Sequence, residues 1–190
     1  METVEPALVA RARNGDVEAF GELFRSTHQR IYNFVRHMVT NPEDAADLTQ
    51  RTYVSAWRRL NSLRANEAFW VWLHQIALNT VRDSRKRISR PTVSLDAMAG
   101  DNDGPPGGDV PDWSRGPAEI VLSEDTQAVV REAVRTLPEI HRDVVTMHHL
   151  EEMAVDDIAE VLGISHGTVL SRLARGREAL RRKLGRFLNE

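Results

Sequence analysis

The sequence contains no cysteine, which excludes disulfide bonds and metal sites built from thiolates. It also has no apolar run near the ~18 residues that a membrane-spanning helix requires, and its charged, amphipathic start does not resemble a secretory signal peptide. No Ser-His-Asp order, glycine-rich phosphate loop or paired-carboxylate context stands out, so we expect no catalysis and no cofactor. These absences predict a cytoplasmic protein that is not an enzyme and has no membrane insertion.

The sequence also lacks a large excess of charge of one sign: its 190 residues carry a net charge of only −3. Such a chain has no broad electrostatic attraction for nucleic acid. Its cations are concentrated, however: residues 163–190 hold seven Arg or Lys against two Glu, a local charge of +5. We therefore expect a local DNA contact and poor DNA affinity of the free protein.

Residues 155–177 have the spacing of a helix-turn-helix. A short helix over 155–162 ends at Gly163, where a left-handed residue is favoured. Ser165 is a natural N-cap for a second helix, on which Val169 and Leu173 lie four residues apart as buried positions. The motif predicts two helices that cross steeply over a tight turn, the second of them presented to DNA.

The exposed face of that second helix is expected to carry hydrogen-bonding side chains for phosphates and base edges. These are His166, Thr168, Ser171, Arg172, Arg175 and Arg177. A solvated basic helix with no ligand is the alternative interpretation. The correctly spaced turn in front of the helix favours the DNA-reading interpretation.

Helical spacing of apolar residues continues through the first half. Residues 6–38 predict two helices separated at Asn14-Gly15-Asp16, and residues 67–87 predict another after a loop at 61–66. Between them, a helix over about 41–60 has Asn41 as N-cap, Pro42 at its first position and two acids in its first turn. No segment favours a strand.

Two further side-chain groups have competing interpretations. Arg82, Arg85, Lys86 and Arg87 exceed what a helix C-terminus needs, although helix-end preference explains part of the cluster. His141, His148 and His149 would allow a metal site, but a helix surface explains them at least as well, so no metal is predicted. 

The stretch from 91 to 122 is rich in Pro, Gly and Asp, carries a charge of −5 and has no sustained period. We interpret it as a flexible linker between two domains, residues 1–90 and 123–190. The fold class predicted is therefore all-α, with two small helical domains.

Two separate segments resemble the extracytoplasmic-function (ECF) sigma factors, the small promoter-recognition subunits of bacterial RNA polymerase in the sigma-70 family. NPEDAADLTQRTYVSAWRRL and FWVWLHQIALNTVRDSRKR resemble region 2, and LPEIHRDVVTMHHLEEMAVDDIAEVLGISHGTVLSRLARGREALRRKL resembles region 4. The resemblance covers everything except the linker. It implies binding to core polymerase (beta and beta-prime subunits) and promoter DNA, recognition of −35 and −10 elements, DNA melting, and control by an anti-sigma factor.

The resemblance also implies roles for individual residues. Core polymerase binding would use Asp44, Asp47, Leu48 and Gln50. Contacts to the −10 element and the melted strand would use Tyr53, Trp57, Arg58, Leu63, Arg64, Asn79, Arg82, Arg85 and Lys86. At −35, Ser171 and Arg175 would read bases, while Arg172 and Arg177 would hold the backbone.

Four residues depart from the family pattern: Arg51, Leu63, Leu170 and Gly176 stand where an acid, an aromatic, a cation and an Ala are common. We expect them to affect which promoter is read, and Gly176 to weaken an exposed helix interior by ~1 kcal/mol. The main alternative function is a stand-alone helix-turn-helix regulator, which the acidic helix at 41–60 and the second basic cluster disfavour. An anti-sigma or adaptor protein would not need a DNA-reading helix.

Overall fold

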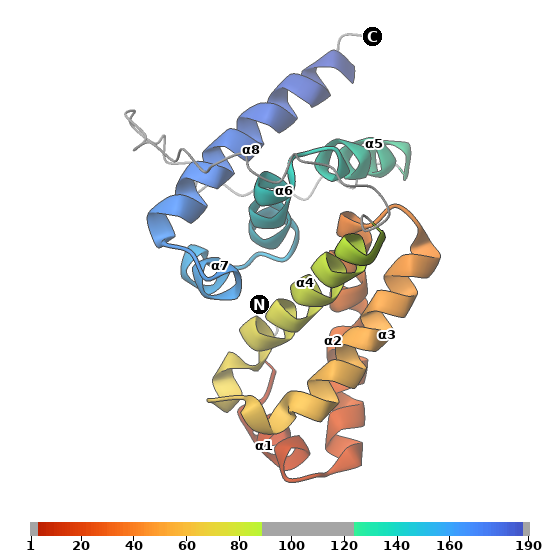
Figure 1. Cartoon of the computed structure of the whole chain (residues 1–190), viewed down its shortest axis with the longest axis vertical. Helices are drawn as coiled ribbons and strands as arrows, with labels where there is room; N and C mark the ends of the chain where they lie inside the picture. Colours follow the sequence, from red (N-terminus) through yellow and green to blue (C-terminus); the bar gives the residue numbers. More distant parts are fainter. Residues whose placement is uncertain (1–3, 89–123, 188–190) are drawn as a thin grey trace.

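The computed structural model describes residues 4–88 and 124–187, and within these two ranges every regular element is helical. Figure 1 shows two helical groups, one from each range, packed against each other. The first group consists of α1 (Pro6–Arg13), α2 (Val17–Met38), α3 (Pro42–Arg59) and α4 (Phe69–Ile88), with short 3₁₀ turns η1 (Leu60–Ser62) and η2 (Asn66–Ala68). The all-α prediction is confirmed; the predicted linker at 91–122 lies outside the described residues.

The first domain begins its helices where the sequence predicts them. Gly15 takes the left-handed conformation (φ +89°) between α1 and α2, and the Asp16 carboxylate accepts from the Ala19 amide to cap α2. The Asn41 side chain accepts from the Glu43 amide and caps α3. Helices α2, α3 and α4 then share a core that includes Phe34, Phe69, Leu23 and Leu73.

The second domain contains α5 (Glu124–Arg135), α6 (Glu139–Val145), a π-helical turn η3 (Thr146–Leu150), α7 (Val155–Leu162) and α8 (His166–Phe187). The predicted helix-turn-helix is confirmed. Gly163 is left-handed (φ +66°), and the Ser165 hydroxyl accepts from the Thr168 amide at 3.2 Å to begin α8. Val169 and Leu173 are buried as expected.

Close packing of α8 on α6 corrects the expectation for Gly176. This glycine is buried, not exposed, and a Cβ added to it would lie 2.6 Å from Cγ2 of Val145. The missing side chain lets the two helix backbones approach. Gly176 therefore fixes the position of α8 on its domain.

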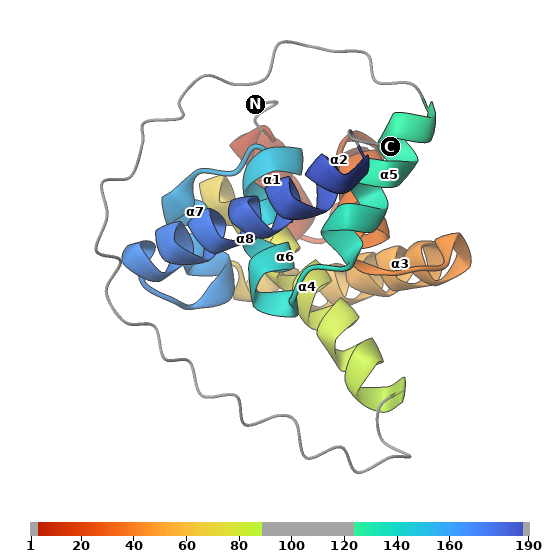
Figure 2. The same ribbon diagram turned by 90° about the horizontal axis from the view of Figure 1, so that it is seen from above.

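The two domains also contact each other, mainly through α4 with α7 and through α2 with α5 and η3. Figure 2, seen from above, shows α5 lying over part of α2, while the end of α4 and the start of α3 extend to the side. Near the contact centre, the Arg30 guanidinium lies 4.3 Å from the Trp70 ring centroid and donates to the Glu151 carbonyl at 3.1 Å. Nε2 of buried His74 lies 3.6 Å from a carboxylate oxygen of Glu151.

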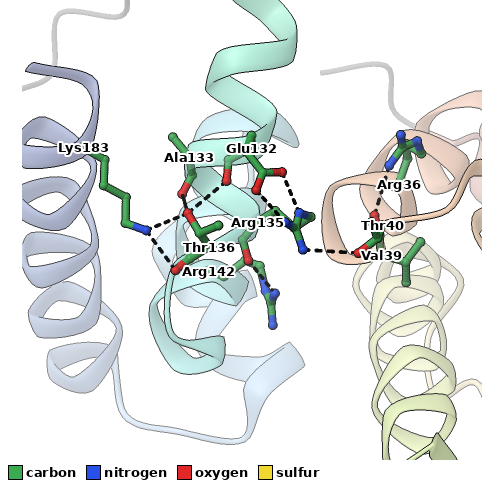
Figure 3. Close-up of polar contacts among 9 residues, drawn as sticks. All are labelled: Arg36, Val39, Thr40, Glu132, Ala133, Arg135, Thr136, Arg142 and Lys183. Atoms are coloured by element: carbon green, nitrogen blue, oxygen red, sulfur yellow. Dashed lines mark hydrogen bonds and ion pairs between the residues drawn. The ribbon is translucent and has the colours of Figure 1, made fainter. Parts of the chain in front are cut away.

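The end of α5 is tied on two sides (Figure 3). Lys183 of α8 donates to the Thr136 hydroxyl at 2.6 Å, within the second domain. Arg135 donates to the Thr40 hydroxyl at 3.3 Å, across to the connection between α2 and α3. The C-terminal end of α5 is therefore held by both the C-terminal helix and the first domain.

Candidate nucleic-acid and partner interfaces

The recognition helix α8 presents a different face from the one that the sequence predicted. His166, Leu170, Ala174 and Arg175 are exposed. Thr168 and Arg177 are partly buried, and Ser171 and Arg172 keep only 8% of their surface accessible. The prediction that all six candidate side chains share one exposed face is therefore wrong for Ser171 and Arg172. These two positions therefore lie on the side of α8 that packs against its own domain.

Two of the candidate side chains are held by local hydrogen bonds. The Ser171 hydroxyl donates to the Thr168 carbonyl at 3.0 Å, so its proton is used within the helix. The Arg177 Nε donates to Nε2 of His149 at 3.0 Å. Burial, and secondarily the Arg177 charge, lowers the pKa of His149 to about 4, so that the ring is neutral and can accept at pH 7. His149 thus orients Arg177, a role that no sequence pattern indicated.

The candidate residues for the −10 element divide into buried and exposed groups. Tyr53 and Leu63 are 4% and 3% exposed, so the expectation that they face DNA does not agree with this structure. Tyr53 shares a 2.7 Å hydrogen bond with Thr27, and its burial raises the pKa of the phenol. Arg58, Arg64 and Asn79 are exposed, so they are accessible to a ligand.

The loop between α3 and α4 is fixed from the N-terminal helix. Arg13 at the end of α1 donates to the Asn66 side-chain oxygen at 2.9 Å, and α1 packs on both η1 and η2. Leu60 and Leu63 anchor the same loop in the core. The exposed Asn61 and Arg64 are therefore displayed by a loop whose backbone is held at several points.

An apolar groove of about 750 Å³ lies between α2 and α3. It is lined by Val17, Phe20, Phe24, His28, Ala46, Gln50, Tyr53, Val54, Trp57 and Arg58. The Trp57 ring is 39% exposed and lies 4.8 Å from the Phe20 ring, which places Trp57 in the groove. Helical spacing of apolar residues did not predict this groove. The exposed Val54, on the polar face of α3, was a signal for it.

The candidate polymerase-binding residues lie beside this groove. Gln50 lines it, while Asp44 and Asp47 are exposed on the same helix, α3. Leu48 is 3% exposed and supports the helix from within, so the structure does not present it to a partner. The Asp47 carboxylate pairs with Arg51 at 2.8 Å, one turn later. Arg51 therefore shields the acid that the family resemblance marks for docking.

The basic end of α4 is already paired with the second domain. Arg82 lies 2.7 Å from a carboxylate oxygen of Asp143, and Arg85 lies 3.2 Å from one of Glu139, both on α6. Asp143 is fully buried, and burial raises its pKa while the Arg82 charge opposes that shift. Lys86 remains exposed. The structure thus places two of the three predicted strand-binding cations in an interface between domains.

The described part of the chain contains no group of three or more His, Asp or Glu side chains arranged to hold a metal ion. His148 contacts the Met153 carbonyl and His149 accepts from Arg177, so both rings have protein partners. In the described ranges no helix is both long and apolar enough to span a membrane. The exposed chemistry is an apolar groove and separate polar and basic surfaces, which suits binding to macromolecules.

Comparison with known protein families finds two matches along the chain. Residues 23–90 match the model for Sigma-70 region 2, and residues 127–180 match that for Sigma-70, region 4. RNA polymerase sigma-H factor of Pseudomonas aeruginosa is 31% identical over 183 residues, covering 96% of this chain and 95% of that protein. The ECF RNA polymerase sigma factor SigW of Bacillus subtilis is 30% identical over 190 residues, covering 97% and 98%.

Solved structures show the same fold. CnrH in complex with the cytosolic domain of CnrY superposes with a TM-score of 0.67 at 23% identity, covering 95% of this chain and 96% of that one. The sigma factor RpoE in complex with the anti-sigma factor NepR from Bartonella quintana gives 0.68 at 22% identity, covering 87% and 96%.

Proposed function

The chain belongs to the ECF sigma factors of the sigma-70 family, and from this membership we propose how its surfaces bind polymerase and promoter DNA. Its function is that of an RNA polymerase sigma factor. It would bind core polymerase, recognise the −35 and −10 elements, promote melting, and act in the cytoplasm without catalysing a reaction itself. The observation that carries this proposal is the order of the two matched regions, each with its own exposed binding surface.

For the −35 element, the N-terminal half of α8 would enter the major groove. His166 and Arg175 are the exposed candidates for hydrogen bonds to bases. Arg177, oriented by His149, would contact the DNA backbone. Ser171 and Arg172 would contribute through helix packing unless α8 shifts on its domain when DNA binds.

For the −10 element, exposed side chains at the α3–α4 loop and on α4 would meet an unpaired base. Arg58, Arg64 and Asn79 offer hydrogen bonds, and extruding a base costs a few kcal/mol that stacking and hydrogen bonds offset. Arg82, Arg85 and Lys86 would hold the phosphates of the opened strand. Arg82 and Arg85 must first leave the carboxylates of α6.

For core polymerase, the groove between α2 and α3 together with Gln50 and Asp47 forms the proposed docking surface. Apolar burial in the groove would supply affinity, and the exposed polar rim would supply orientation. An anti-sigma factor is a second proposed partner, because one structurally similar sigma factor was solved with such a protein. It would compete with polymerase for the groove.

A stand-alone helix-turn-helix regulator is not favoured, because region 2 occupies the first half of the chain. Run-off transcription by purified core polymerase, with and without this chain, tests the proposal. We expect promoter-specific transcripts only when the chain is present. Operator binding by the free protein, with no effect on transcription by core polymerase, would contradict it.

The docking surface has its own test in two substitutions one helical turn apart. Asp47→Arg should abolish co-purification with core polymerase, because it places a cation on the docking surface. Arg51→Ala should preserve or increase it, because Asp47 loses its 2.8 Å partner. Glu160→Arg, exposed on α7, is the charge-matched control and should bind normally. Normal binding by Asp47→Arg would refute the assignment.

A further inference from the structure

The exposed stripe at the start of α8 contains an apolar side chain at its centre. His166, Leu170 and Ala174 are spaced four residues apart and are all exposed, so they share one face of the helix. Leu170 is 37% exposed and is not among the apolar side chains that pack against the core. Its neighbours Ser171 and Arg172 are turned inward. Leu170 therefore stands where the recognition helix would approach DNA.

A leucine in a major groove has only one kind of partner on the base edges. It can neither donate nor accept a hydrogen bond, so the polar groups on the base edges offer it no favourable partner. Thymine carries the largest apolar group of the major groove, its 5-methyl group. Helical side chains lean toward the N-terminus, which is the end of a recognition helix that contacts bases.

We propose that Leu170 is a specificity-determining residue that selects thymine in the −35 element by contact with its 5-methyl group. The proposal rests on the proposed sigma function and deepens it. Ala174, one turn later, extends the same apolar stripe and excludes water from the contact. The departure of Leu170 from the cation common at this position would thus replace a charged contact with a methyl contact.

The test uses holoenzyme reconstituted from core polymerase and the full chain. A promoter is first selected from random-sequence duplex DNA, and each thymine of its −35 element is then replaced by deoxyuridine. This change removes one methyl group and leaves every hydrogen bond in place. We expect one position at which the wild-type holoenzyme loses about fourfold in affinity, the value expected for one buried methyl group. The Leu170→Ala holoenzyme should not distinguish thymine from deoxyuridine at that position.

Leu150→Ala is the matched control, because Leu150 is also 37% exposed but belongs to η3 and not to the recognition helix. It should retain the wild-type response to deoxyuridine. A response of Leu170→Ala equal to that of wild type, or an element without any methyl-sensitive thymine, would overturn the Leu170 assignment alone. Failure to select any −35 preference would instead contradict the proposed sigma function.

The ion pairs between α4 and α6 support a second, independent inference. Asp143 is fully buried and Glu139 lies beside it, and together they bind the guanidinium groups of Arg82 and Arg85. A carboxylate pair on a guanidinium pair has the charge arrangement that phosphates would have there. We infer that α6 is a built-in competitor for the DNA phosphates at Arg82 and Arg85, and that the free chain is held closed by it.

The double variant Glu139→Gln/Asp143→Asn tests this inference, since it keeps shape and removes both negative charges. The sequence has no cysteine, so single cysteines at exposed Glu22 and Glu160 can carry a pair of spectroscopic distance labels. We expect the labels to move apart in the double variant. The affinity of the free full-length chain for single-stranded DNA should rise on the order of tenfold, as the open fraction rises.

Glu18→Gln/Glu22→Gln, without labels, controls for the change in net charge, because both glutamates are exposed on α2. It should bind single-stranded DNA at most slightly more tightly than wild type. Equal gains in the two double variants, or an unchanged label distance, would overturn the inference. The distance measurement does not require polymerase or a promoter, so it can fail without contradicting the sigma function.

Discussion

Replacing Gly176 by alanine tests whether the contact between α8 and α6 determines the position of the recognition helix on its domain. The new Cβ would lie 2.6 Å from Cγ2 of Val145 and 3.5 Å from both Cβ and the backbone oxygen of His141. Val145 is 1% exposed and belongs to the hydrophobic core. Overpacking of this kind costs about 1–3 kcal/mol. The higher helix propensity of alanine offsets about 1 kcal/mol of this cost. We therefore expect the free energy of unfolding to fall by about 0–2 kcal/mol.

Gly21→Ala is the matched control, since Gly21 is inside helix α2 and its added Cβ would meet only the end of Arg25, at 3.6 Å. This variant should benefit from the higher helix propensity of alanine without a steric cost, and it should become more stable by about 1 kcal/mol. Urea unfolding followed by circular dichroism would measure both variants. The steric argument requires them to differ by about 1–3 kcal/mol. Equal stabilisation by both alanines would refute it and would restore the expectation of an exposed helix interior.

Three further predictions address pH, base reading and the linker. Burial, with the charges of Arg131 and Arg36, lowers the pKa of His37 to about 4. Because the unfolded chain then binds more protons than the folded one, the free energy of unfolding should fall as pH drops from 6.5 toward 4. The fall should be less steep in His37→Gln. In promoter binding by holoenzyme, Arg175→Ala should lose about 1–3 kcal/mol of discrimination at one or two base pairs, whereas Arg177→Ala should weaken all sequences alike. Deleting about twelve residues from 91–122 should reduce initiation, because the linker would span two promoter elements only when extended; undiminished run-off transcription would contradict this.

The sequence predicted the elements that depend on local chemistry. Asn41, Gly15, Gly163 and Ser165 act at helix ends, where side-chain and backbone geometry within a few residues decide the structure. The 3.6-residue spacing likewise placed Val169 and the rest of the helix-turn-helix core correctly. These features could be predicted because no distant segment is needed to produce them.

The orientation of the candidate site could not be predicted in the same way. Ser171 and Arg172 are buried where α8 packs on the rest of its domain, and that packing joins segments distant in sequence, such as Gly176 with Val145. Leu63 is buried, and the 3₁₀ turns on both sides of it pack on α1, a segment distant in sequence. The groove between α2 and α3 is formed by residues from two helices, so periodicity within either helix does not reveal it.

The pairing of Arg82 and Arg85 with α6 also affects how the protein responds to salt. Added salt weakens contacts between cations and DNA phosphates. It also screens the partly exposed ion pairs of Arg82 and Arg85 with Glu139, so it favours opening. The two effects oppose each other. The affinity of the free chain for DNA should therefore fall less steeply with salt than its phosphate contacts alone would predict. A bacterium whose internal ion concentration rises would therefore lose less of this DNA contact than a chain without the interface would.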